Sequence, residues 1–205
     1  HNYADGEDFG TMTDDSFEMD IYSAGAMWDW RINDKWTFSN AARVDRWTTE
    51  RDSTLDTTDT KIDLPNTDME PSDTEFSFNS GLVYQVDQDS SLRLSLGRGL
   101  HIPSLVELAF DEETSPFSEL YGNPTLDTEV NYTADLGYTR NMPEQNFTFG
   151  GNIVYQQIQD LIVPTVRDFG GGNAKADYTF ENVGDSKAVF LELFAKGKLL
   201  EDRLH

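Results

Sequence analysis

The sequence contains no cysteine, few basic residues and only three histidines, at positions 1, 101 and 205. Its 205 residues include 15 Lys and Arg against 38 Asp and Glu, which gives a formal net charge of −23. These absences leave no thiolate nucleophile and no recognisable catalytic triad. They also disfavour nucleic-acid binding, because neutralising phosphates requires a basic patch. We therefore expect neither enzymatic activity nor a cofactor.

A long apolar run is also missing. No stretch approaches the roughly 20 apolar residues of a membrane-spanning helix, and the mean hydropathy of −0.57 would suggest a soluble protein. A transmembrane β-barrel escapes this test, because only alternate residues of its strands meet lipid. The first residues form no basic region followed by an apolar stretch, as a signal peptide would. If the chain comes from an outer-membrane protein, we expect the natural N-terminal segment with its signal peptide to be missing from this sequence.

What the sequence does contain is a repeated alternation of apolar and polar residues. Between Val130 and Thr139 the even positions are apolar and the odd positions polar or glycine. This period fits a strand with one apolar and one polar face, and no helix. The same pattern recurs along the chain and predicts about seven strands, near 17–32, 36–46, 75–86, 91–99, 130–140, 146–158 and 187–200.

The connections between these segments alternate in length. Short stretches of turn-forming residues join the first and second, third and fourth, and fifth and sixth segments, as hairpins require. The other connections each exceed about 20 residues, which would be unusual in a compact soluble domain. They are 48–74, 101–129 and 160–186. Short turns on one side and long loops on the other are typical of an up-and-down transmembrane barrel.

Four short motifs follow one another in the second half of the chain. Residues 97–105 read Gly-Arg-Gly-Leu-His-Ile-Pro-Ser-Leu, and residues 121–126 read Tyr-Gly-Asn-Pro-Thr-Leu, with Glu129 following. Residues 158–162 read Ile-Gln-Asp-Leu-Ile, and residues 180–184 read Phe-Glu-Asn-Val-Gly. In this order the motifs resemble the barrel segment of TonB-dependent outer-membrane receptors. His101 and Ile102 stand where that family usually has Arg and Ala, and Thr128 replaces a usual Pro.

The resemblance implies a fold class: all-β, an antiparallel up-and-down transmembrane β-barrel segment with about seven strands of a 22-stranded barrel. Residues 1–205 would form one partial outer-membrane barrel domain, and we expect the plug domain and the remaining strands to be absent. The implied location is the cell outer membrane of a Gram-negative bacterium. Phe76, Phe78, Leu82, Tyr132, Leu136, Phe147, Phe149 and Ile153 should face lipid. Asn79, Arg93, Asn131, Asp135 and Asn152 should face the lumen.

The implied function is energised, TonB-dependent uptake of a scarce nutrient, with a ferric siderophore or other metal chelate as the favoured ligand. The implied partners are outer-membrane lipid, the ligand, and the TonB energy-coupling complex, which would be contacted through a missing N-terminal segment. Two other readings of the alternation stay open. One is a non-energised porin or adhesin barrel, and the other is a soluble β-sandwich, either a lectin-like carbohydrate-binding protein or a hydrolase.

Three residues in or beside the predicted loops are candidates for ligand contact. Trp47 and Tyr121 are aromatic residues that could stack on a ligand. For Trp47 the alternative is a place in the membrane-boundary girdles. His101 is the third, because a histidine at a strand end is able to contact a metal chelate, although most such residues are solvated or hydrogen-bonded.

Acidic residues gather between positions 99 and 139, where there is no Lys or Arg. Solvated loops explain this cluster, and binding of calcium or another hard cation is the alternative. No spacing resembles an EF-hand loop, so the sequence predicts no particular metal ligand.

Overall fold

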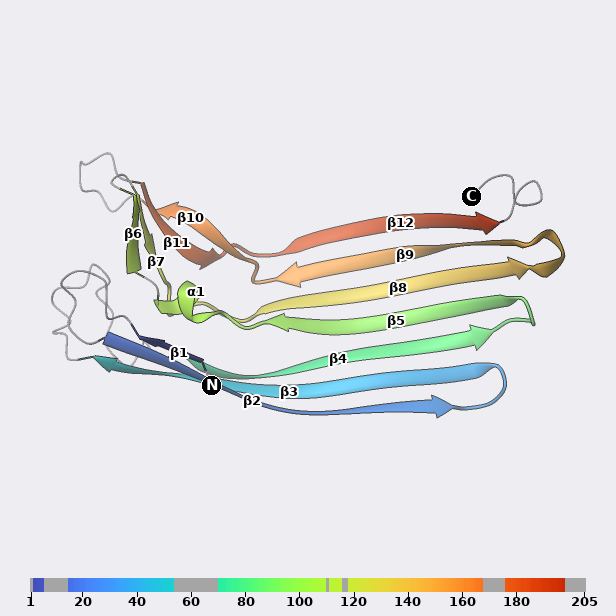
Figure 1. Ribbon diagram of the computed structural model, residues 1–205, viewed down its shortest axis with the longest axis horizontal. Coiled ribbons are helices and arrows are strands. Elements are labelled where there is room, and N and C mark those ends of the chain that lie inside the picture. The colour runs from blue at the N-terminus through green and yellow to red at the C-terminus, as the bar shows by residue number, and fades with distance from the viewer. Residues whose placement is uncertain are drawn as a thin grey trace.

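The computed structural model describes residues 2–5, 15–53, 70–109, 111–115, 118–167 and 176–197. Its main feature is one long twisted sheet of eight strands in the order β1-β2-β3-β4-β5-β8-β9-β12 (Figure 1). Every neighbouring pair in this sheet is antiparallel. The strands thus form the meander of hairpins that an up-and-down barrel uses.

The seven predicted strands are confirmed, with small differences at their ends. They are β2 Asp15–Arg31, β3 Trp36–Ser53, β4 Ser72–Gln85, β5 Ser90–His101, β8 Glu129–Met142, β9 Phe147–Gln159 and β12 Ser186–Gly197. The short strand β1, Asn2–Asp5, was not predicted and pairs with β2. Strand β3 continues well past its predicted end at residue 46, and the end predicted for the last strand, 198–200, lies outside the described residues.

The short turns are held by local hydrogen bonds at one end of the sheet (Figure 1). In the first turn, Asn33 Oδ1 accepts hydrogen bonds from the backbone N–H groups of Lys35 and Trp36, at 2.8 and 3.0 Å. In the second, the N–H of Asp89 donates to Asp87 Oδ1 at 2.9 Å, and this bond lowers the pKa of the Asp87 carboxyl. In the third, the 3₁₀ turn η2, Pro143–Gln145, ends at Asn146 in the left-handed region, with φ 50°.

The register sorts the side chains of the main sheet onto two faces. Leu82, Leu94, Leu136, Ile153 and Leu191 are consecutive cross-strand partners. We call their side of the sheet the apolar face. All eight side chains predicted to meet lipid lie on it. The five predicted to face the lumen lie on the opposite side, which we call the polar face.

Large side chains of the apolar face have no covering layer in the described part of the chain. Leu136 is 51% exposed and Ile153 is 54% exposed. A β-sandwich would bury this face against a second sheet, whereas a membrane barrel presents it to lipid. The fold is therefore a segment of an antiparallel transmembrane β-barrel, and the sandwich reading is wrong. Among the described residues, no helix is long and apolar enough to cross a membrane.

The described residues of the connections 101–129 and 160–186 fold into further structure. They form the short helix α1, Leu105–Ala109, and a second sheet of four strands in the order β10-β11-β7-β6. Its strands are β6 Asp111–Ser115, β7 Ser118–Tyr121, β10 Ile162–Arg167 and β11 Ala176–Asn182. Strands β7 and β11 pair in parallel although they come from different connections. Both α1 and this sheet lie at the end of the main sheet opposite the short turns (Figure 1).

Candidate functional site at the loop end of the sheet

The four motif segments meet at the loop end, in a hydrogen-bonded cluster that we call the motif junction. Asn123 Nδ2 donates to the carbonyl oxygen of Phe180 at 2.8 Å, which links the second motif to the fourth. Asn182 Nδ2 donates to the carbonyl oxygens of Asp127 and Asp160, at 3.1 and 2.7 Å. Asn182 Oδ1 accepts from the N–H of Asp127 at 2.9 Å. Two asparagine side chains thus join segments that are far apart in the sequence.

Helix α1 begins with a capping box formed by Ser104 and Glu107. Glu107 Oε2 accepts from the N–H and the hydroxyl of Ser104, both at 2.8 Å, and Ser104 Oγ accepts from the N–H of Glu107 at 3.3 Å. The other end of α1 lies against Gly122. A Cβ at Gly122 would be 2.4 Å from the backbone nitrogen of Ala109, so only glycine allows this approach. The glycine of the second motif therefore fits α1 onto the junction.

An apolar cluster ties the junction to the barrel wall. Met19 of β2 and Trp47 of β3 pack with Leu108 of α1 and Leu126 of the second motif, and all four are buried. Because Met19 and Trp47 lie on the polar-face side of their strands, the loop segments fold over that face of the sheet. Trp47 is only 2% exposed, and its Nε1 has no hydrogen-bond partner among the described residues.

The candidate His101 lies at the edge of the junction. Its Nε2 is 3.5 Å from Glu107 Oε2, and its Nδ1 is 3.8 Å from Glu129 Oε2. Glu129 Oε2 also accepts a hydrogen bond from the N–H of Ile162, at 3.1 Å. His101 thus lies between the ends of β5 and β8, α1 and the start of β10, and its side chain is 48% exposed. It is the most accessible of the three candidates.

The structure brings Trp47, His101 and Tyr121 to the same end of the sheet without exposing all of them. Tyr121 ends β7 beside β11 and is 4% exposed, so its ring, like that of Trp47, is covered. Ligand contact by the three residues stays a prediction. Within the described residues no group of three or more His, Cys, Asp or Glu side chains is arranged to hold a metal ion.

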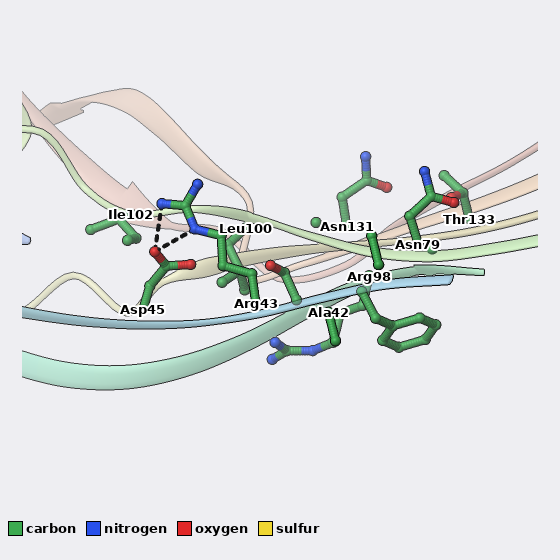
Figure 2. Close-up of a pocket in the computed structure, with 14 residues that line it drawn as sticks. Ala42, Arg43, Asp45, Asn79, Arg98, Leu100, Ile102, Asn131 and Thr133 are labelled. Atoms are coloured by element: carbon green, nitrogen blue, oxygen red, sulfur yellow. Dashed lines mark hydrogen bonds and ion pairs between the residues drawn. The ribbon is translucent and has the colours of Figure 1, made fainter. Parts of the chain in front are cut away.

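A second feature is a hollow of about 550 Å³ on the polar face (Figure 2). Residues of β3, β4, β5 and β8, together with Ile102 just after β5, line it, and we call it the polar hollow. Gly97 and Gly99 form part of its wall, and its polar lining residues are Arg43, Asp45, Ser77, Asn79, Arg98, Asn131 and Thr133. The sequence predicts that Asn79 and Asn131 lie on this face, but no pattern in it indicates that they share a cavity.

Asn123 and Asn182, which join the loops, are not among the site residues that the sequence predicts. Both lie within the quoted motifs, and Asn123 shows a local signal, because its Oδ1 accepts from the N–H of Thr125 at 3.0 Å, as in an Asx turn. Asn182 has no such signal, because its partners Asp127 and Asp160 are distant in sequence.

Solved structures with the same fold belong to transporters and receptors. The copper transporter OprC has a TM-score of 0.66 at 18% identity, and the match covers 92% of this chain and 27% of that one. The Serratia marcescens hemophore receptor HasR, in complex with its hemophore HasA and heme, has 0.66 at 13%, covering 88% and 32%. The ferric-catecholate import receptor Fiu from Escherichia coli K12 has 0.57 at 13%, covering 91% and 26%.

This chain thus spans about a quarter to a third of the length of these proteins. At such low identity the likeness shows the fold alone. A comparison with curated proteins found no match. A family model described as "TonB dependent receptor-like, beta-barrel" matches residues 2–199, nearly the whole chain. The eight-strand meander, its two faces and the motif junction agree with that match. The chain belongs to the TonB-dependent receptor β-barrel family.

Proposed function

We propose that the complete protein carrying this chain is a Gram-negative outer-membrane receptor that imports a scarce nutrient, a metal chelate, by TonB-dependent energised transport. The proposal rests on one observation: this chain belongs to the receptor family and contains the motif junction. Two long connections are fastened by Asn123, Asn182 and the Trp47 cluster over the polar face, the face that lines the lumen of a membrane barrel.

The ligand class is suggested by the matched structures and by charge. The solved relatives are named for copper, heme and ferric catecholate. This chain carries a formal net charge of −23, and like charges slow the encounter of an anionic ligand with a surface. A neutral or cationic chelate is therefore favoured over an anionic one.

Contact with the chelate is proposed for the loop end, with His101 as the first candidate. Its side chain is 48% exposed, and neutral imidazole is a common metal ligand. Trp47 and Tyr121 are covered in this structure, so they would reach a ligand only if the junction opened.

The test is uptake of labelled chelates by cells with and without the full-length gene, each in strains that have or lack the TonB complex. Neutral, cationic and anionic ferric chelates should be compared, with a labelled oligosaccharide as the non-metal probe. Uptake that needs both the gene and the complex supports the proposal. Uptake that persists without the complex would indicate a porin. Coupled uptake of the oligosaccharide alone would keep the mechanism and replace the ligand.

A further inference from the structure

One basic residue interrupts the row of leucines that β5 presents on the apolar face. The apolar-face positions of this strand are Leu92, Leu94, Leu96, Arg98 and Leu100. A charge among lipid-facing side chains is costly, and such a residue usually has a partner and a role. The Arg98 side chain is only 17% exposed, whereas the residue Leu96 is 42% exposed. Arg98 is therefore covered by its neighbours and does not simply extend into lipid.

Arg98 lies where β4 and β5 stop pairing. The two strands pair only as far as Phe78 and Arg98. Beyond this point β4 continues to pair with β3, and β5 continues to pair with β8. The strands therefore diverge toward the loop end (Figure 1), and we call the gap between residues 72–77 of β4 and 99–101 of β5 the seam. Because every backbone polar group inside a membrane needs a partner, a seam in a barrel wall has to be closed.

The guanidinium of Arg98 spans the seam. Its Nη2 donates to Glu75 Oε2 at 2.7 Å, and its Nη1 donates to the carbonyl oxygen of Phe76. Both acceptors belong to β4 beyond the last strand pair. On the other side, Arg98 Nε donates to the hydroxyl of Tyr132 at 3.3 Å, and the guanidinium carbon is 5.8 Å from the centre of that ring, within cation–π range. One side chain of β5 thus bonds to β4 and to β8.

This bridge lies on the lipid side of the gap whose lumen side is the polar hollow. Arg98 is among the residues that line the hollow, and its side chain points away from Asn79 and Asn131 (Figure 2). Its partner Glu75 takes a polar-face position, so the ion pair runs through the seam from one face to the other. The Glu75 side chain is only 20% exposed. Both charges are thus engaged with each other.

We infer that Arg98 is a seam clasp: its guanidinium takes the place of the missing β4–β5 pairing, holds the diverging strands at a fixed separation and closes the wall against lipid. The inference goes beyond the proposed function, because it concerns the wall and applies whichever ligand is imported. Arginine suits this role because its planar fork bonds two acceptors in fixed directions, whereas a lysine ammonium is a single point charge. A leucine at this position would continue the leucine row and leave Glu75 without its partner.

The experiment measures the width of the seam in the full-length receptor in liposomes. Nitroxide labels are attached at Phe76→Cys and Leu100→Cys, which would be cross-strand partners if the β4–β5 pairing continued, and their spin–spin broadening reports their separation. The control labels are at Leu82→Cys and Leu94→Cys, which are partners in the paired part. This sequence contains no cysteine, and any cysteine elsewhere in the receptor is replaced by serine. We expect Arg98→Leu to reduce the broadening of the seam labels and to leave that of the control labels unchanged.

The matched control variant is Arg93→Leu. It removes another ion pair of β5, with Asp135 at 3.2 Å, at a level where β4 and β5 are paired, so both label pairs should stay unchanged. Urea unfolding in the same liposomes gives a second readout. Arg98→Leu should lower the folded-to-unfolded ratio at a given urea concentration about 10- to 150-fold, as loss of hydrogen bonds to a charged group predicts. If Arg98 were only a charge facing lipid, the leucine would raise this ratio.

Three results would overturn the inference: unchanged broadening of the seam labels in Arg98→Leu, a higher folded-to-unfolded ratio in that variant, or an equal loss of broadening in Arg93→Leu. If Arg98→Leu does not insert into liposomes, Arg98→Lys and Glu75→Gln replace it. Each nearly keeps the side-chain length and weakens the bridge, so each should reduce the broadening of the seam labels, and no change in both would also reject the clasp. Because none of these readouts involves uptake, a failed uptake test of the proposed function would leave the clasp standing.

Discussion

Gly122→Ala should weaken the packing of helix α1 against the motif junction. A Cβ at this position would lie 2.4 Å from the nitrogen of Ala109 and 2.5 and 2.7 Å from the carbonyl carbon and oxygen of Leu108. All three are backbone atoms, so no flexible side chain is able to give way, and α1 must move by about 1 Å to reach ordinary contact distance. That shift pulls Leu108, which is 3% exposed, out of the cluster with Trp47.

Overpacking of this kind typically costs about 1–3 kcal/mol. Because α1 is a short loop element, the cost should appear as easier local opening and not as global unfolding. The amide N–H of Leu108, which donates to Ser104, and that of Asn123, which donates to Glu107, should therefore exchange with deuterium about 5- to 150-fold faster. Hydrogen–deuterium exchange with mass spectrometry on the full-length protein reads these segments directly.

Gly81→Ala is the matched control, because a Cβ at that position meets nothing within 4 Å. It lies within β4, where replacing glycine should be neutral or stabilising by roughly 0.5–1 kcal/mol. Equal exchange of α1 in Gly122→Ala and the parent would refute the steric reasoning. Faster exchange over the whole barrel in both variants would show that the assay reports general destabilisation instead.

Three further predictions concern the barrel wall, the apolar cluster and a turn. Leu136→Lys on the apolar face should lower the free energy of unfolding in lipid by about 2–4 kcal/mol, and Ser95→Lys on the polar face by far less; equal losses would contradict the assignment of faces. Trp47→Ala should destabilise the fold by about 3–5 kcal/mol, whereas Val106→Ala, at a side chain 48% exposed, should have little effect; if Trp47→Ala reduced only ligand affinity, Trp47 would be a ligand contact. The Asp87 carboxylate accepts a hydrogen bond from the N–H of Asp89, which lowers the pKa of Asp87 in the folded protein. The stabilisation of the turn by this bond should therefore be complete above the unfolded pKa of about 3.9. It should be lost as the pH falls through the lower pKa of the folded state. NMR titration of the Asp89 amide should show that inflection, and Asp87→Asn should abolish it.

The positions of the strands and their two faces could be predicted from the sequence, because both depend on local properties of the chain. In a strand the side-chain period is two, so the alternation around Leu136 and Asp135 fixes which residue meets lipid and which meets the lumen. The same alternation restricts the register, since a slip by one residue would put every apolar side chain on the wrong face. Turn-forming residues such as Asn33 then placed the hairpins, because their side chains bond to backbone within the turn.

The loop end depended on contacts between distant segments, which no local pattern contains. Parallel pairing of β7 with β11 brings together residues such as Leu120 and Tyr178, and Asn182 bonds to carbonyl oxygens in two other segments. The sequence predicts Trp47 in a membrane-boundary girdle or against a ligand, but α1 and Leu126 cover it. The polar hollow exists because β4 and β5 stop pairing at Phe78 and Arg98. The alternation in each strand is the same whether its neighbour pairs or diverges, so only the tertiary structure decided where the wall opens.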